Sequence, residues 1–415
     1  MASIGAILSL DAVGKHDTYL DSPDPRDSLF HYKLPERHAK FAHYHKVTTI
    51  SRPRGDATSW PFSATVTTIL NPQELGDYLT GITLRIPLPT LPDAQSRLTT
   101  YCNKVGWHFI NNLNIKIDEV DILSVYGDTL MLDYELNMSS SEKRASDVML
   151  GGDTADAHNV TVKIPTGFTK STPLPLCAIH RQKLRVSIDF NPVSFFSDTG
   201  EKLDIKCFDI ITGLVDIDPF HRLTLIDAPI ERVFTTLVRQ PVFEIPEQTR
   251  DTKHKYNLVG SDSVRAFIWF LRRDVVEQVE DITHFDNRFN LSNSPARDSA
   301  TQNLNPILDN AEIFINSQSN SPPVIDPTRK DISTRNFYKF NRRFYVPTRD
   351  IFSFCHSLYP DKEMPTGMLD MSKTNSNGTF LQMTLNHRVS EVVQLHVYFL
   401  VDKRYKIERG HLTAS

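Results

Sequence analysis

Apolar and polar residues alternate one by one along several segments of this chain, and this alternation constrains the fold more than any other feature. Residues 184–190 (LRVSIDF) give a clear example. A period of two places alternate side chains on opposite faces of a β-strand, so each segment predicts a strand with one face in a core and one in water. The alternating segments are 82–88, 113–117, 160–164, 184–190, 313–315, 381–385 and 393–401.

Helical patterns are few and short. Residues 71–81 predict one brief helix. Residues 140–150 predict another, which starts with serine and is followed by Gly151 and Gly152. The chain has 25 prolines and 16 glycines. Prolines at this frequency interrupt long helices and suit strand ends and loops, so the sequence predicts an all-β protein.

The length predicts two domains. A chain of 415 residues exceeds one ordinary β-sandwich, and its 40% of apolar residues can build two cores. The proline-containing stretch 216–229 is the best candidate for the seam, although the two halves share no repeat at the residue level. The polar stretches 292–305 and 316–334 predict long surface loops or intersubunit contacts.

The charge of the chain disfavours nucleic acid as the main partner. The formal net charge is −4, whereas phosphate binding usually needs a basic surplus. One stretch, 336–349, does interleave aromatic residues with lysine and arginine. It could stack single-stranded bases, or it could be a strand with aromatics in the core and cations paired outside. We favour the strand.

No targeting or membrane-spanning segment is visible. The most apolar stretch, 392–401, is too short to cross a bilayer. The cysteines show no metal-finger spacing, and they predict free, mostly buried thiols in a reducing compartment. They are Cys102, Cys177, Cys207 and Cys355.

Candidate catalytic and metal-binding residues are sparse. His43 and His45 would share a face of a strand, with His38 upstream, but a third ligand at suitable spacing is missing. Two acidic groups, one within 118–121 and one at Asp216 and Asp218, could bind calcium or serve glycoside hydrolysis, yet a solvated turn is the simpler interpretation. No nucleophile motif or phosphate-binding loop occurs. We therefore predict no enzymatic activity and neither a cofactor nor a metal.

Four Asn-X-Ser/Thr sequons occur, and such sequons usually mark exposed loops. Without a signal peptide the chain would not meet the usual glycosylation machinery, so we expect chance occurrences. The four asparagines are Asn137, Asn159, Asn290 and Asn377.

Several segments, in the same order, resemble major capsid proteins of nucleocytoplasmic large DNA viruses, the iridovirus- and phycodnavirus-like family. GAILSL at 5–10 and GKHDTYL at 14–20 are similar to the family's N-terminal arm. YCNKVGWH at 101–108 and the following strand resemble a strand pair of the family, and YGD at 126–128 occupies the place of its turn. VKIP at 162–165 and PLPL at 173–176 resemble its next segment.

The C-terminal half continues the resemblance. IFSF at 351–354, PTG at 365–367 and DMS at 370–372 are similar to the family's signature there. The resemblance assigns structural roles to a set of signature residues: Gly106, Tyr126, Gly127, Pro165, Pro173, Pro175, Pro365, Gly367 and Ser372.

The resemblance implies two tandem eight-stranded jelly-roll β-sandwiches. It implies an N-terminal arm at 1–30, a first jelly roll at 31–220 and a second at 221–415, with the arm beneath a homotrimer. Such trimers have a pseudo-hexagonal outline and tile an icosahedral shell. Implied partners are other copies, minor capsid proteins and possibly the inner viral membrane. The implied location is the outer capsid of the virion, with synthesis in the host cytoplasm.

Two alternatives stay open. The first is a minor capsid or scaffold protein of the same double jelly-roll family. The second is a carbohydrate-binding or carbohydrate-active β-sandwich, which needs a carboxylate pair in a cleft or an aromatic sugar-binding face. The three tryptophans, Trp60, Trp107 and Trp269, are far apart in the sequence.

Overall fold

The computed structural model describes residues 41–414 except 56–58, 90–100, 103, 152–158, 169–171, 198–202, 247–252, 261, 275–288, 294–305, 320–346, 359–365 and 387–390. Residues 42–415 form one compact unit. The predicted N-terminal arm, most of both predicted long loops and most of the basic aromatic stretch lie outside the described residues.

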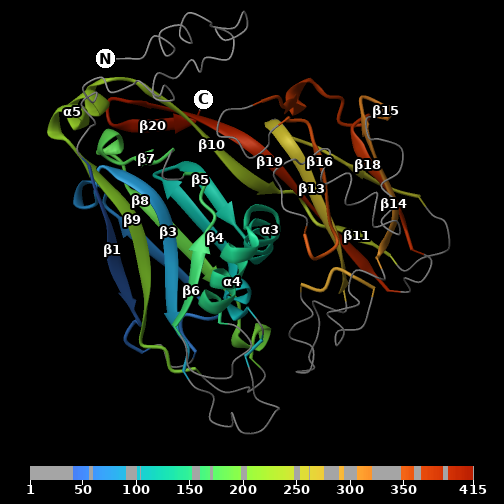
Figure 1. The fold of residues 1–415 in the computed structure, drawn as a ribbon, viewed down its shortest axis with the longest axis horizontal. Helices are drawn as coiled ribbons and strands as arrows, with labels where there is room; N and C mark the ends of the chain where they lie inside the picture. The colour runs from blue at the N-terminus through green and yellow to red at the C-terminus, as the bar shows by residue number, and fades with distance from the viewer. Residues whose placement is uncertain are drawn as a thin grey trace, which may run out of the picture. The chain divides into compact units, whose positions relative to one another are not determined.

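The first half of the larger unit is a sandwich of two antiparallel sheets (Figure 1). One sheet has the order β1 (Phe41–Ser51), β9 (Cys207–Ile217), β3 (Tyr78–Pro87) and β6 (Asn159–Ile164), with the short β7 (Leu174–Pro175) paired to β3. The facing sheet has the order β2 (Thr65–Leu70), β8 (Leu184–Phe190), β4 (Ile110–Ile117) and β5 (Val120–Val125).

The second half is also a sandwich. Its larger sheet has the order β10 (Ile230–Arg239), β19 (Val393–Glu408), β13 (Ser263–Arg273) and β16 (Ile351–Cys355), extended by β11 (Phe243–Ile245), β17 (Leu369–Asp370) and β20 (His411–Ala414). Its smaller sheet has the order β12 (Lys253–Asn257), β18 (Phe380–Leu385), β14 (Leu308–Ile315) and β15 (Gln318–Ser319).

Both sandwiches have the same strand connectivity. When the eight principal strands of each half are counted along the chain, one sheet reads first, eighth, third, sixth and the other reads second, seventh, fourth, fifth. This order is that of a jelly roll, which winds two Greek keys into two facing sheets. The prediction of two tandem eight-stranded jelly rolls is confirmed. The chain thus repeats a topology without repeating a sequence.

The helices are short and lie between strands. They are α3 (Gly127–Asn137), α4 (Ser140–Met149) and α5 (Pro219–Asp227), with 3₁₀ turns η2 (Pro72–Glu74), η3 (Val105–His108), η4 (Cys177–Ile179), η5 (Val193–Phe195) and η8 (Met371–Lys373). None of the helices in the described part of the chain is long and apolar enough to span a bilayer.

The two helices predicted from the sequence had different outcomes. The helix at 140–150 is confirmed as α4: Ser139 Oγ accepts from the Glu142 N–H at 3.4 Å, and the Ser139 N–H donates to the Glu142 carboxylate at 2.7 Å. The helix at 71–81 is wrong, because only η2 is helical there. Asn71 caps this single turn, and the chain then enters β3, where the buried Leu79 and Ile82 join the core.

The larger sheet of the second sandwich is buried on both faces along β13 and the first half of β19. Its inner face, with Trp269 and Phe399, fills the second core. Its outer face, with Phe270 and Tyr398, belongs to the same apolar cluster as the first core. The strand β13 is therefore buried along nearly its whole length. The two sandwiches share this sheet as a common wall.

The chain crosses between the sandwiches at α5, the helix that follows β9 and precedes β10. Asp218 begins the helix by accepting from the Phe220 N–H at 2.9 Å. Arg222 ties α5 to the first sandwich, since its Nε lies 3.2 Å from the buried carboxylate of Asp77.

Candidate functional site

The turn formed by Tyr126 and Gly127 leads the chain from β5 into α3. The Tyr126 N–H donates to Thr129 Oγ1 at 3.2 Å, and the Thr129 N–H donates to the Tyr126 carbonyl at 2.9 Å. This exchange begins the helix at Gly127. A Cβ atom at Gly127 would lie 2.6 Å from the carbonyl oxygen of Trp107, so the close approach requires glycine. The turn places Asp128 in the first turn of α3.

We expect Gly127→Ala to lower the free energy of unfolding by about 1–3 kcal/mol, because the backbone at Trp107 must move to admit a methyl group. Urea denaturation followed by tryptophan fluorescence measures this loss. The matched control is Gly81→Ala, where an added Cβ meets nothing within 4 Å. Equal midpoints for the two variants would contradict the steric role of Gly127.

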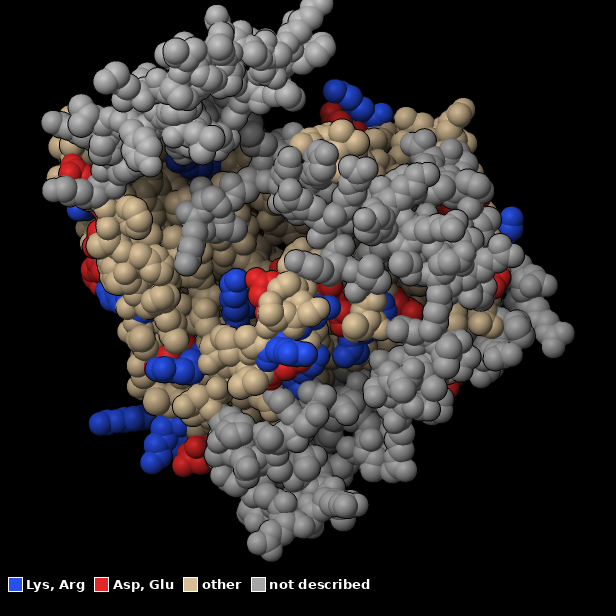
Figure 2. Space-filling view, viewed as in Figure 1, with Lys and Arg blue, Asp and Glu red and all other residues tan. Residues whose placement is uncertain are grey.

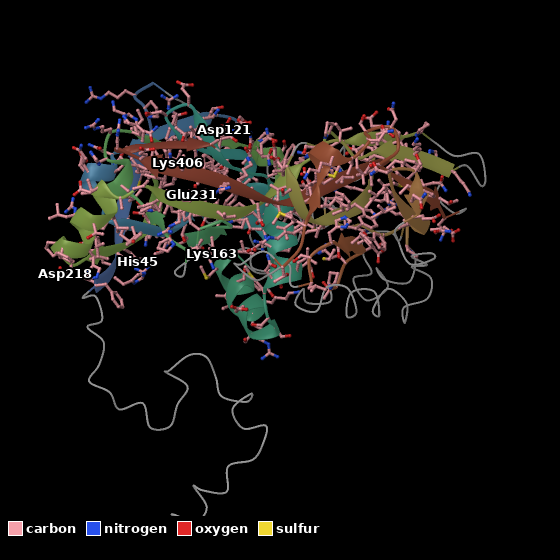
Figure 3. The ribbon with its side chains drawn as sticks, turned by 90° about the horizontal axis from the view of Figure 1, so that it is seen from above. His45, Asp121, Lys163, Asp218, Glu231 and Lys406 are labelled. Carbon is pink, nitrogen blue, oxygen red and sulfur yellow. The ribbon has the colours of Figure 1, made fainter. Side chains whose placement is uncertain are left out.

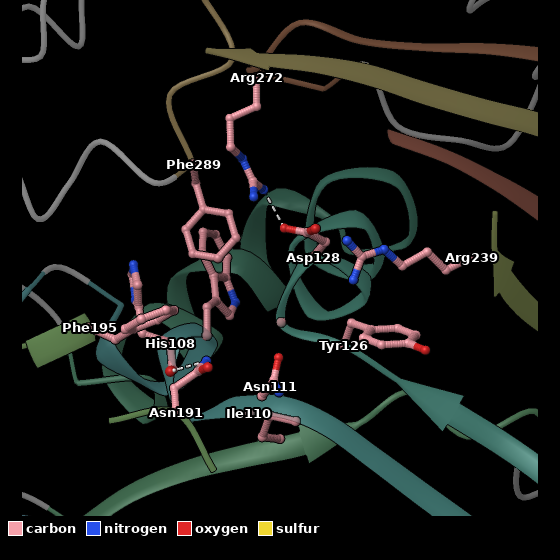
Figure 4. Close-up of a pocket in the computed structure, with 12 residues that line it drawn as sticks. His108, Ile110, Asn111, Tyr126, Asp128, Asn191, Phe195, Arg239, Arg272 and Phe289 are labelled. Atoms are coloured by element: carbon pink, nitrogen blue, oxygen red, sulfur yellow. Dashed lines mark hydrogen bonds and ion pairs between the residues drawn. The ribbon is translucent and has the colours of Figure 1, made fainter. Parts of the chain in front are cut away.

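Asp128 joins the two sandwiches through a buried polar cluster (Figure 4). Its carboxylate, on the first sandwich, forms an ion pair with Arg272 of β13. Tyr398 Oη donates to it at 3.3 Å, and His396 Nδ1 lies 3.7 Å away, both from β19. All four residues are less than a tenth exposed. The cluster therefore buries charge at the boundary between the two sandwiches.

The charges in this cluster are set by burial and by the arginine. Burial alone would raise the pKa of Asp128, but the neighbouring positive groups, Arg272 first and Arg239 among them, together outweigh it and lower the pKa to about 2. Burial, reinforced by the Arg272 charge, lowers the pKa of His396 to about 3. Near neutral pH the cluster therefore holds one carboxylate, one guanidinium and a neutral imidazole.

Glu135, two turns further along α3, makes a second buried link. Its oxygens accept from the Thr348 N–H at 2.9 Å and the Thr348 hydroxyl at 2.8 Å, just before β16. Lys143 Nζ lies 3.1 Å and Arg349 Nε 3.4 Å from the carboxylate. Burial raises the pKa of Glu135, but the Thr348 hydrogen bonds and the two cations together lower it. One face of α3 thus carries two ionised carboxylates toward the second sandwich.

Aromatic side chains surround these ion pairs. The Trp107 ring packs edge-on against Tyr134 at 5.1 Å and against Phe289 at 5.2 Å between centroids. Lys104 Nζ lies 4.1 Å from the Tyr134 ring centroid. Such packing excludes water and raises the energy of any charge left unpaired. Beside Asp128 a cavity of about 280 Å³ remains open.

The C-terminal hairpin makes a separate contact with the first sandwich. β19 runs from the second sandwich toward the first, and β20 pairs with its end (Figure 1). The Leu412 N–H donates to Gln182 Oε1 at 2.6 Å, and the Arg181 N–H donates to the Gly410 carbonyl at 3.3 Å. Tyr405 Oη donates to the Asp121 carbonyl at 3.2 Å. The last strands of the chain therefore fasten the two halves together.

The signature residues fall into two groups. Tyr126 and Gly127 line the cavity beside Asp128, and Gly106 packs within the first sandwich, where a Cβ on it would lie 2.7 Å from Leu150. The others lie elsewhere in the two sandwiches. Pro175 is in β7, and Pro165 and Pro173 lie between β6 and β7. Gly367 adopts a positive φ of 121°, and the hydroxyl of Ser372, in η8, donates to the Asp370 carboxylate. Pro365 lies outside the described residues.

The sequons are not equally accessible. Asn137, Asn159 and Asn377 are exposed. Asn290 is fully buried, and its side-chain oxygen accepts from the Ser292 hydroxyl at 2.7 Å. The expectation of an exposed loop is therefore wrong at Asn290, because this asparagine closes a buried turn.

The remaining candidate residues stay apart. His43 and His45 are exposed and their rings pack edge to face on β1, while His38 lies outside the described residues. Figure 3 shows Asp121, beside the β4–β5 turn, well separated from Asp218 at the start of α5. Among the described residues no three His, Cys, Asp or Glu side chains form a potential metal site.

The tryptophans and cysteines are largely internal. Trp60, Trp107 and Trp269 are at most 3% exposed, so they offer no sugar-binding face. All four cysteines lie in the described ranges and none is disulfide-bonded; Cys102 and Cys177 are buried.

Sequence reasoning missed the partners of the junction. Asp128 lies in the YGD motif, but Arg272, His396, Tyr398 and Glu135 carry no local signal of their role. Arg349 belongs to the basic aromatic stretch and pairs with an acidic residue, Glu135, but its side chain is only 17% exposed and it lies in a bend before β16, so the predicted outward-facing strand is wrong at this residue. The rest of that stretch, 336–346, lies outside the described residues.

Comparison with known proteins points to viral capsids. Residues 48–212 match the family described as "Major capsid protein N-terminus", a range that begins in β1 and ends in β9. No curated protein sequence gives a significant match to the chain.

Solved structures share the fold across the whole chain at low identity. The VP54 protein of PBCV-1, fitted into a reconstruction of the virophage Sputnik, has a TM-score of 0.73 and 15% identity, covering 93% of this chain and 99% of that one. The Faustovirus major capsid protein has a TM-score of 0.66 and 9% identity, covering 97% of each chain. A Sputnik virophage chain has a TM-score of 0.56 and 11% identity, covering 95% and 92%.

Proposed function

We propose that this chain, whose residues 48–212 match the family described as "Major capsid protein N-terminus", is a major capsid protein that assembles as a homotrimer and tiles the shell of a large DNA virus. The observation that carries the proposal is the repeated connectivity of its two jelly rolls. A subunit with two similar lobes gives six similar lobes around a threefold axis. A six-lobed block packs into a flat hexagonal array, which the facets of an icosahedral capsid require.

The junction of the sandwiches supports this role. A tile must keep a fixed angle between its lobes, and here the two lobes share a sheet that is buried on both faces. The buried ion pairs of Asp128 with Arg272 and of Glu135 with Arg349 add geometric specificity to that packing. A rigid two-lobed subunit is what a regular lattice needs.

Exposed apolar side chains supply candidate contact surfaces. Phe220 is 74% and Leu223 60% exposed on α5, and Val148 on α4 is 81% exposed. Large exposed apolar residues often mark interaction sites, and α4 and α5 follow different strands of the first sandwich. We assign these helices to contacts between subunits or with minor capsid proteins.

The remaining attributes follow the same proposal. The protein acts as a building block and not as an enzyme, in the outer capsid of a virion assembled in the host cytoplasm. Its partners are other copies, minor capsid proteins beneath the shell and possibly the inner viral membrane. Positive and negative side chains are mixed over the face in Figure 2, which agrees with protein partners more than with nucleic acid.

Light scattering coupled to size exclusion tests the trimer. We expect the purified full chain to elute with three times the chain mass of 47.3 kDa. The expected mass should persist on dilution, because an obligate interface of this kind buries about 2,000 Å² or more. A chain that stays monomeric at high concentration would contradict the proposal.

Copy number separates the main shell protein from a minor capsid or scaffold protein of the same family. We expect this chain to be among the most abundant proteins in purified virions, as quantitative mass spectrometry would measure. Presence only in immature particles would instead indicate a scaffold. The carbohydrate-active alternative loses support because the three tryptophans are buried.

A further inference from the structure

We propose that the cavity beside Asp128 binds a small oxyanion of the phosphate or sulfate class, held by Arg239. The cavity measures about 280 Å³ and lies between α3 of the first sandwich and the shared sheet of the second. Figure 4 shows Arg239 and Arg272 entering it from different strands, with Asp128 between them.

The charges that line the cavity do not balance. Arg239 and Arg272 each bring a positive charge, while Asp128 is the single acidic residue among the described lining residues. Arg272 and Tyr398 already bind the Asp128 carboxylate. Among the described lining residues there is therefore one surplus positive charge, and that charge resides on Arg239.

The backbone of Arg239 pairs with Tyr398 in the sheet, but its side chain has no hydrogen bond or ion pair with the described residues. Its side chain is half-buried, and its contact is with the ring of Tyr126, whose centroid lies 4.9 Å from the guanidinium carbon. Stacking on an aromatic ring fixes the plane of a guanidinium but leaves its N–H donors unused. A forked set of donors in one plane suits two oxygens of the same oxyanion.

The opposite wall offers further donors. Asn111 and Asn191 line the cavity, and each uses its amide nitrogen for one bond, to Asp189 at 2.7 Å and to the His108 carbonyl at 2.9 Å. An amide nitrogen has a second hydrogen to donate. A volume of about 280 Å³ accommodates a tetrahedral oxyanion with several waters, since each water takes roughly 30 Å³.

Binding would join the two halves of the subunit. Arg239 belongs to β10 of the second sandwich, whereas Asn111 belongs to β4 of the first. An oxyanion bound between them would pair with the surplus charge on Arg239 and link the two sandwiches. We therefore expect the ion to stabilise the junction in addition to occupying it.

Thermal unfolding of the full chain tests the site, with inorganic phosphate and sulfate as probes against sodium chloride at equal ionic strength. Both anions stabilise proteins generally by exclusion from the surface, so the site appears only as a difference between variants. We expect the wild type to show a saturable rise in midpoint that Arg239→Gln lacks. The control Arg185→Gln removes the same charge from an exposed position on β8 and should keep the rise.

Phosphorus NMR gives a second measurement that does not depend on the variant's stability. Wild-type protein should broaden the inorganic phosphate resonance, and sulfate should reverse the broadening. Arg239→Lys keeps the charge but loses the planar pair of N–H donors, and we expect its phosphate affinity to fall about tenfold. Dimethyl phosphate represents a phosphodiester from nucleic acid or lipid, and we expect it to compete more weakly than the free ion.

Three results would overturn the proposal. The first is an equal rise in midpoint for Arg239→Gln and Arg185→Gln, which would leave only the general salt effect. The second is a phosphate resonance that wild-type protein does not change. The third is tighter competition by dimethyl phosphate, which would reject a free oxyanion as the ligand.

Discussion

Replacing Asp128 by asparagine is expected to lower the free energy of unfolding by about 3–5 kcal/mol. The substitution keeps the size of the side chain but leaves the Arg272 guanidinium buried without its counter-charge. The side chains of Arg272 and Asp128 are only 7% and 10% exposed, and the few waters that the adjoining cavity can hold do not supply the lost counter-charge. Urea denaturation followed by tryptophan fluorescence measures the change, with Trp107 beside the cluster as a local reporter.

Two variants make this result interpretable. Glu231→Gln breaks the ion pair with Arg404, whose side chains are 55% and 59% exposed, and we expect it to change stability by less than about 1 kcal/mol. The double variant Asp128→Leu, Arg272→Met removes both charges and should recover most of the loss. Equal effects of Asp128→Asn and Glu231→Gln would show that the junction does not depend on this ion pair.

Acidification from pH 7 to pH 4.5 is expected to destabilise the subunit by about 2–3 kcal/mol through His396. The pKa of His396 is lowered to about 3 in the folded protein, while a histidine in the unfolded chain titrates near pH 6.5. Between these values the unfolded chain binds more protons than the folded one. Stability therefore falls as the pH falls. For this residue the slope of stability against pH is at most the slope that the binding of one proton produces.

The variant His396→Phe isolates this contribution. The imidazole stacks on Phe270 with centroids 4.9 Å apart, so a phenyl ring can keep the packing without titrating. Between pH 6.5 and pH 3, we expect the variant to lack the part of the pH dependence of stability that the binding of about one proton produces. Burial lowers the pKa of His356 to about 4, and we expect this residue to keep its own contribution to the pH dependence of stability in the variant. The control His45→Gln changes an exposed ring, and an identical pH slope in all three proteins would refute the role of His396.

Most strands that the sequence revealed have one solvent-facing side. The segment 393–401 is an exception: a water-facing side was expected, but β19 is buried on both faces there, because its outer face packs on the first sandwich. Leu184, Val186 and Ile188 alternate with exposed or half-buried residues in β8, and the period of two made that strand visible. β13 has no such period, because its outer face packs on the first sandwich while its inner face fills the second core. A strand buried on both faces reads as a plain apolar run, which periodicity cannot distinguish from a helix.

The helices also show that a sequence pattern is visible only where an element is partly exposed. α4 was predictable because Ser139 and Glu142 form local end signals on an exposed helix. α3 is buried nearly all round, so its apolar residues form no stripe along one face. Without such a stripe, the periodicity predicted no helix at these residues. At 71–81 local propensity favoured a helix, but burial of Leu79 in the core placed the chain in β3 instead.

The junction could be located only in part. The turn at Tyr126 and Gly127 was identified by resemblance, and the structure supplies its physical reason in the approach to Trp107. The residue paired with Asp128 lies 144 positions away, and Tyr398 lies 270 positions away. Pairings of that range depend on how the sandwiches meet, which no local pattern encodes.

Cryo-electron microscopy of the purified full-length chain tests the central claim most directly, namely that two identically connected sandwiches form one rigid tile. We predict threefold particles with six lobes, in which the two lobes of each subunit keep the same relative orientation in every class. Particles with two lobes and no threefold symmetry, or lobes whose relative orientation varies between classes, would contradict this account.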